Sequence, residues 1–182
     1  MKAIWALFTI LTSAAAAEPY AIQIRLTNTA VAAPAVLYQA KSTASAIFAP
    51  LGLKLDWTAS PAGKPIEIRF EPGAPDRPES LAYAMPYLTG GTSIHIFIDR
   101  IAAIAPAPRT GVLLGHVLAH EITHVLERIV RHSDVGIMKA HWDPRDFRAM
   151  DSHPLPFASI DVLLLQAAGA TQSSPSTTLA VN

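Results

Sequence analysis

The sequence contains no cysteine, which excludes disulfide bonds and thiol chemistry. It also lacks a net charge, because 14 lysine and arginine residues balance 14 aspartate and glutamate residues. No overall electrostatic field would therefore attract nucleic acid or an anionic membrane to this protein. The fold has to be stabilised by packing, with or without a bound metal, and its partners have to be selected by a local site.

The apolar run near the N-terminus is too short to cross a membrane. Residues 3–11 are mainly apolar, whereas a membrane helix needs about 20 such residues. One lysine precedes the run, and small residues ending in Ala15, Ala16 and Ala17 follow it, which is the pattern of a secretory signal peptide. We therefore expect a signal peptide at residues 1–17, cleaved near Ala17. The mature protein would be secreted or periplasmic, without stable membrane insertion.

The remaining chain has the composition of one globular domain. Hydrophobic residues make up 51% of the sequence and charged residues 15%, which is enough apolar material for one buried core. The last residues, TQSSPSTTLAVN, are small and mostly polar. We expect one domain at residues 18–170 and a disordered tail at residues 171–182.

Short alternating segments predict strands, and longer segments without a break predict helices. The segment EPGAPDRPES holds three prolines and a glycine and predicts a surface loop, and a Gly-Gly pair further on predicts the turn of a hairpin. In chain order, the patterns predict strands at residues 21–30, 53–57, 65–70, 81–88 and 92–99, and helices at residues 35–48, 111–130, 144–150 and 159–170.

Two histidines with an acid between them lie on the longest predicted helix. His120 and His124 are four residues apart, which separates them by about 6 Å along a helix axis and about 40° around it. Both imidazoles can therefore bind one metal ion. Glu121 lies at the edge of the same face, where it can hold and deprotonate a water molecule. This HExxH arrangement also arises by chance in many proteins, so a further ligand is needed to support it.

A catalytic zinc ion needs three protein ligands and one open position, so a third donor must come from outside the pair. His132 is the candidate, and Asp134 is its rival. If the helix continued through His132, that side chain would lie about 12 Å beyond His124, against a zinc–nitrogen bond of about 2.0 Å. The helix must therefore end first. The segment VLERIVR contains no glycine, so a left-handed turn residue in it would cost about 1–2 kcal/mol.

The segment AHEITHVLERIVRHSDVGIMKAHW resembles the metzincin group of zinc proteases, whose pattern combines HExxH, a third histidine and a methionine turn below the metal. More narrowly, it is similar to a group of bacterial metalloproteases with an extended spacing to the third histidine, followed by HSxxGIM. The resemblance covers residues 118–142. Most metzincins have the third histidine six residues after the second, at the position of Val130 here, whereas His132 comes eight residues after His124.

The resemblance implies an α+β fold of the metzincin-like zincin type, with a small mixed, twisted sheet, a long active-site helix and a C-terminal helical part. It implies a zinc ion (Zn2+) bound by His120, His124 and His132. It further implies that Glu121 is the general base of peptide-bond hydrolysis, so the expected partner is a peptide or protein substrate. We expect the protein to act as a monomer and not to bind nucleic acid.

The residues around this motif have expected roles as well. Met138 would form the methionine turn, as a hydrophobic floor that makes no bond to the metal. His141 and Trp142 follow that turn, where related proteases have substrate-pocket residues, and His141 could polarise the substrate carbonyl. His95 lies on the strand that the resemblance implies as the substrate-aligning edge.

Two other interpretations remain open. The protein could be a secreted binding or structural domain with a closed, non-catalytic zinc site, in which His116, Asp134 or His141 supplies a fourth ligand. It could also be a domain without metal, in which HExxH occurs by chance. A water molecule in the fourth position would support the enzyme, and a fourth side chain would refute it.

Overall fold

The computed structural model describes residues 21–58, 64–73, 78–86 and 92–173. The predicted signal peptide lies outside these residues, as does most of the predicted tail. The last helix continues to Ser173, so the first residues assigned to the tail are helical. Within the described residues, no helix combines the length and the apolar character required to cross a membrane.

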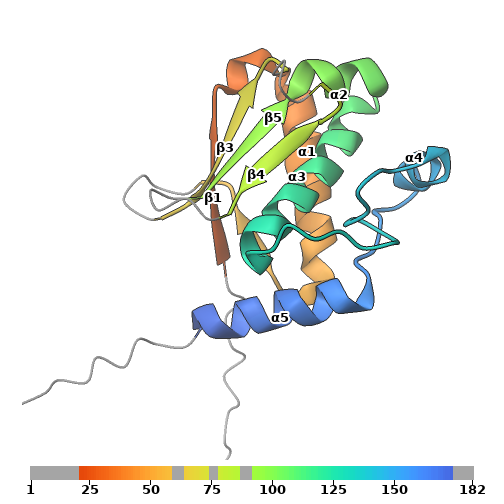
Figure 1. Ribbon diagram of the computed structural model, residues 1–182. Coiled ribbons are helices and arrows are strands. Elements are labelled where there is room, and N and C mark those ends of the chain that lie inside the picture. Colours follow the sequence, from red (N-terminus) through yellow and green to blue (C-terminus); the bar gives the residue numbers. More distant parts are fainter. Residues whose placement is uncertain (1–20, 59–63, 74–77, 87–91, 174–182) are drawn as a thin grey trace, which may run out of the picture.

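Five strands form one mixed sheet in the order β2-β1-β3-β5-β4 (Figure 1). β1, β3 and β5 pair in parallel, β2 joins β1 in parallel, and β4 pairs antiparallel with β5. β5 therefore lies inside the sheet and β4 forms one edge. The strands are β1 (Ala21–Thr27), β2 (Lys54–Asp56), β3 (Ile66–Glu71), β4 (Ala82–Met85) and β5 (Ser93–Phe97).

Two long helices cover one face of the sheet, and the remaining elements lie around them (Figure 1). The long helices are α1 (Pro34–Phe48) and α3 (Thr110–Glu127). Gly115 allows them to approach closely, because a Cβ atom there would lie 2.8 Å from the carbonyl oxygen of Ala40. The other elements are η1 (Thr29–Val31), η2 (Ala49–Leu51), α2 (Ile98–Ile104), α4 (Pro144–Met150) and α5 (Ser159–Ser173).

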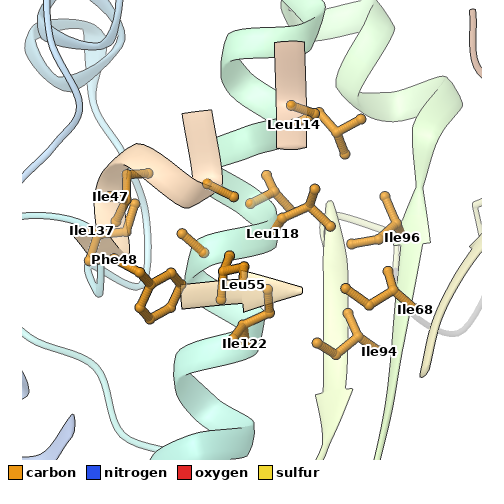
Figure 2. Close-up of a cluster of buried hydrophobic side chains, with 14 of the residues drawn as sticks. Ile47, Phe48, Leu55, Ile68, Ile94, Ile96, Leu114, Leu118, Ile122 and Ile137 are labelled. Atoms are coloured by element: carbon orange, nitrogen blue, oxygen red, sulfur yellow. The ribbon is translucent and has the colours of Figure 1, made fainter. Parts of the chain in front are cut away.

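The core lies between the sheet and these two helices (Figure 2). Strand residues alternate between the two faces, so the isoleucines at every second position all point toward the helices. Leu114, Leu118 and Ile122 of α3 are fully buried against them. The opposite face of the sheet is polar and carries the ion pairs Arg25–Glu67 and His95–Glu71.

The structure differs from the sequence-based expectation at two helix boundaries. Residues 98–104 form α2, although residues 98 and 99 were expected to extend the hairpin strand. The alternation of isoleucines continues through Ile98, but Ile101 is buried from a helical position. α3 ends at Glu127 instead of near Val130, because the chain reverses at Arg128.

Candidate metal centre

Three histidines gather beside the end of α3. His120 and His124 lie on the helix, one turn apart, and His132 lies in the segment that follows it. One ligand atom from each side chain lies within 4.8 Å of those of the other two. The ring centroid of His132 is 5.3 Å from that of His120 and 5.1 Å from that of His124. The three residues that the sequence predicts as ligands are therefore together in space.

The reversal of the chain after α3 makes this arrangement possible. Arg128 has φ 54° and ψ 33°, the left-handed conformation that helices commonly use to end. The turn directs the carbonyl oxygen of Ile129 back to Nδ1 of His124, at 3.1 Å. The chain then returns past the helix end and brings His132 to the other two histidines. A residue with a Cβ atom, Arg128, therefore adopts the left-handed conformation at the end of the helix.

The imidazole rings of His120 and His124 are oriented by backbone carbonyl groups. Nδ1 of His120 lies 2.9 Å from the carbonyl oxygen of Ile137. A carbonyl oxygen only accepts, so in both rings Nδ1 carries the proton and Nε2 presents its lone pair. The two Nε2 atoms face each other at 3.0 Å. Two lone pairs at this distance repel unless a cation or a proton lies between them.

Burial of the three histidines disfavours a proton between the two Nε2 atoms and leaves a metal cation. Burial, reinforced by the neighbouring His124, lowers the pKa of His120 to about 4. Burial also lowers the pKa values of His124 and His132. The three rings are therefore neutral near pH 7, which is the form that binds metals. Bonds of about 2.0–2.1 Å from each nitrogen to one zinc ion are compatible with the observed separation. The residues fit a divalent metal ion.

Glu121 is buried beside the histidines. Burial raises the pKa of its carboxyl group to about 8, and a hydrogen bond from the backbone of Ala84 opposes part of this shift. Ala84 belongs to the edge strand β4, so the acid lies between α3 and the edge of the sheet. A carboxyl group with a pKa near neutrality can both accept and return a proton.

A cleft of about 620 Å³ opens at this position. Its walls come from the edge strand β4 on one side and from the segment after His132 on the other. Glu121 and the three histidines contribute to its lining. The other lining residues are Glu79, Ser80, Leu81, Ala82, Tyr83, Ala84, Pro86, Ile104, Val117, Val130, Lys139, Ala140, His141, Trp142 and Phe147.

The GIM turn (residues 136–138) contacts the site through the backbone of Ile137. Gly136 has φ 75°, and a Cβ atom on it would lie 2.1 Å from the carbonyl oxygen of Pro156, so only glycine fits. The carbonyl group of Ile137 orients His120, and its amide donates to Pro156 at 2.9 Å. Met138 is buried and its carbonyl oxygen accepts from the amide of Ser133 at 2.8 Å.

The other predicted residues have different positions. His141 is exposed and lines the cleft, whereas Asp134 is exposed and does not belong to the three-histidine group. His95 does not line the cleft: it stacks on Tyr83, and its Nδ1 lies 2.8 Å from Glu71. The expectation that His95 lies on the edge strand is wrong, because β5 pairs on both sides.

His116 is packed against the loop before α5. Its Nδ1 donates to the carbonyl oxygen of Val112 at 2.8 Å, and its Nε2 accepts from the amide of Leu155 at 3.2 Å. Both ring nitrogens are therefore used, and His116 has no free nitrogen for a metal.

Sequence reasoning missed two contributors to the site. The backbone of Ala84 bonds to Glu121, but no side-chain pattern marks that position. Asp161 contacts Arg131 and Ser133 on either side of His132. Its only signal in the sequence is an acid in the first turn of a helix, which also has the ordinary interpretation of a capping residue.

Comparisons with known proteins add little to this geometry. No family model and no curated protein matches the chain. The fold is similar to the solved structure of myroilysin, with a TM-score of 0.41 and 16% sequence identity. The match covers 80% of this chain and 66% of that chain, slightly less than two thirds of its length. The functional argument therefore rests on the site itself.

Proposed function

We propose that the protein is an exported, zinc-dependent metallopeptidase of the metzincin-like zincin type. The observation that carries the proposal is the pair of Nε2 atoms 3.0 Å apart, with a third histidine beside them and a buried acid on the same helix. Within the described residues, the group that could hold a metal contains three side chains and no fourth. This favours an open site over the closed, non-catalytic one.

His120, His124 and His132 would hold the zinc ion. When bound, zinc supplies Lewis acidity, which polarises a substrate carbonyl group and lowers the pKa of water. The chain supplies neutral imidazoles for this purpose, two of them fixed by hydrogen bonds to backbone carbonyl groups. Such contacts hold a ligand in one tautomer and one orientation.

Glu121 would move the proton. Its carboxylate lies in the cleft and takes a proton from the attacking water molecule, then gives the proton to the amine that leaves. Without metal, burial raises the pKa of this carboxyl group to about 8, so it holds its proton at neutral pH. A divalent cation beside it would favour the carboxylate form that accepts the proton.

The substrate would lie along β4. The amide of Phe97 donates to the carbonyl oxygen of Leu81, so Leu81 is directed toward β5. Backbone direction alternates along a strand, so the polar groups of Ala82 and Ala84 point away from β5, toward the cleft, where the backbone of Ala84 already bonds to Glu121. An extended peptide can add to such an edge through its own backbone. This chemistry suits peptides and proteins as substrates.

The test combines a metal assay with a peptidase assay. Purified protein should contain about one zinc per chain and should hydrolyse an unstructured protein such as casein. The Glu121→Gln variant should keep its zinc while hydrolysis falls by about 100-fold or more, because the amide keeps the shape but cannot accept the proton.

Each alternative result has a definite meaning. Protein without metal, and unaffected by added zinc, would leave HExxH as a chance motif. Metal-loaded protein with no hydrolysis would support the binding-domain interpretation. Loss of zinc in Glu121→Gln would make Glu121 a ligand and the proposed proton transfer wrong.

A further inference from the structure

We propose that Asp161 of α5 is a positioning residue for the third metal ligand, which it holds through both chain neighbours of His132. The inference rests on the metal site of the proposed function and adds a residue that lies outside the HExxH segment. Asp161 is fully buried, although it is an acid. A buried carboxylate is costly unless it is paired and hydrogen-bonded, so its contacts indicate what it stabilises.

His132 needs positioning more than the other two ligands do. Nδ1 of His120 and Nδ1 of His124 each bond to a backbone carbonyl group. Among the described residues, no comparable side-chain hydrogen bond to His132 is present; its ring only packs against the other two rings. Its side chain is exposed and follows a reversal without glycine. The position of His132 therefore depends on its backbone.

Asp161 holds the side chains of both chain neighbours of His132 and so restrains the segment that carries it. Oδ1 of Asp161 accepts from the guanidinium group of Arg131 and from the hydroxyl group of Ser133, the latter at 2.8 Å. Nη1 of Arg131 also donates to Oγ of Ser133, at 3.0 Å. The three side chains form a closed set of hydrogen bonds around the residue between them. We refer to Arg131, Ser133 and Asp161 as the clamp.

The clamp is attached to the body of the protein at its other end. Oδ2 of Asp161 accepts from the amide of Ala158 at 3.0 Å, so both carboxylate oxygens are used. Leu165, one turn later on α5, is fully buried in the core. In Figure 1, α5 lies across the end of α3, and the two helices are in contact. The clamp therefore connects the third ligand to a packed helix.

A second acid near Arg131 does not replace Asp161. Glu127 lies 3.8 Å from the guanidinium group, but neither of its carboxylate oxygens has a hydrogen-bond partner among the described residues. It can attract Arg131 without fixing its direction. Asp161, in contrast, accepts hydrogen bonds from the side chains on both sides of His132.

Metal affinity, measured without substrate, tests the role of the clamp. Zinc affinity would be determined by competition with a chromogenic chelator for wild type, Asp161→Asn and Leu165→Ala. Leu165→Ala is the matched control, because it weakens α5 without touching the clamp. Asp161→Asn should bind zinc about 10- to 100-fold more weakly, the range typical of residues that orient metal ligands. Leu165→Ala should lower the melting temperature but keep the zinc affinity within about threefold, because the ligands and their contacts are unchanged.

The visible spectrum of the Co2+-substituted protein gives a second readout. Asp161→Asn should shift this spectrum toward that of His132→Ala, because it weakens the bond between His132 and the metal that His132→Ala removes. Wild-type affinity and spectrum in Asp161→Asn would overturn the clamp, and so would an equal loss of affinity in Leu165→Ala. Wild-type protein that binds no zinc would instead overturn the proposed function.

If Asp161→Asn does not fold, Ser133→Ala decides the question. It removes one hydrogen bond of the clamp from a side chain outside the core. It should weaken zinc binding in the same direction by a smaller factor, and unchanged affinity in this variant would overturn the proposal.

Discussion

The position of one proton on each imidazole determines what the histidines can bind. Carbonyl oxygens hold the protons of His120 and His124 at Nδ1, and burial keeps both rings neutral near pH 7. The lone pairs of Nε2 therefore point at each other across 3.0 Å. A single cation between them removes the repulsion and uses both lone pairs, which is why a metal fits better than a second proton.

Single substitutions distinguish the two candidates for the third ligand, His132 and Asp134. His132→Ala should reduce zinc affinity by more than 100-fold, because it removes a direct ligand. Asp134→Ala should change affinity much less, because Asp134 is exposed and outside the three-histidine group. Zinc titration of both variants would give the order directly. The reverse order would mean that Asp134 binds the metal and that the proposed ligand set is wrong.

At the scale of elements, the end of α3 and the edge of the sheet create the site. Arg128 ends the helix in a conformation that costs a residue with a Cβ atom about 1–2 kcal/mol. This conformation occurs where the reversal brings His132 back to the helix. On the other side, β4 lies next to α3 and bonds to Glu121 through Ala84. Neither element forms the site alone.

Substitutions at Arg128 would measure the strain of this turn. Arg128→Gly should unfold at a higher urea concentration than Arg128→Ala, by about 1 kcal/mol in the free energy of unfolding, because glycine adopts positive φ without a steric penalty. Both variants lose the side chain and its contacts, so their difference isolates the backbone. Equal stability of the two variants would mean that the turn is not strained.

At the scale of the whole molecule, the proposed metal site should add stability to a two-layer fold without disulfides. Removing zinc with a chelator should lower the melting temperature by about 5–10 °C, since a ligand at 100 times its Kd contributes about 2.7 kcal/mol. Added zinc should restore the original value. The His120→Ala variant is the control, and its melting temperature should not respond to the chelator. A wild-type melting temperature that the chelator leaves unchanged would contradict the metal's structural role.

The metal-free protein should also depend on pH through the buried histidines. In the folded state the pKa of His120 is about 4, below its ordinary value of 6.5. Between these values the unfolded chain binds the additional proton, so stability is present above pH 6.5 and is lost as the pH falls toward 4. Glu121 acts in the opposite direction, because its raised pKa means that the folded state holds its proton up to about pH 8.

Comparison with the His120→Gln variant isolates the contribution of His120 to this pH dependence. As the pH is lowered from 6.5 to 4.5, the free energy of unfolding should fall more for metal-free wild type than for metal-free His120→Gln. Urea unfolding measures both values. A difference that is constant with pH would mean that His120 is not held neutral by burial.

Local features of the chain were sufficient to predict much of the fold. Alternating isoleucines predict β1, β3 and β5, and the Gly-Gly turn predicts the antiparallel pair of β4 and β5, because side-chain periodicity and turn chemistry act over a few residues. The geometry of a helix likewise brings His120 and His124 to one face from their spacing alone. The spacing also requires the helix to end before His132, but the conformation of the turn does not follow from the sequence; the structure has Arg128 in the left-handed region.

Contacts between distant segments were decided by the tertiary structure alone. The sequence does not specify that β4 is the edge strand, so His95 was assigned to the wrong position. Ile98 continues an alternating pattern but belongs to α2, because burial of Ile101 requires a helix there. Asp161 lies 30 residues after Arg131, and a hydrogen bond over that separation leaves no periodic trace in the chain. The sequence determines which side chains can bind a metal, and packing determines what holds them in place.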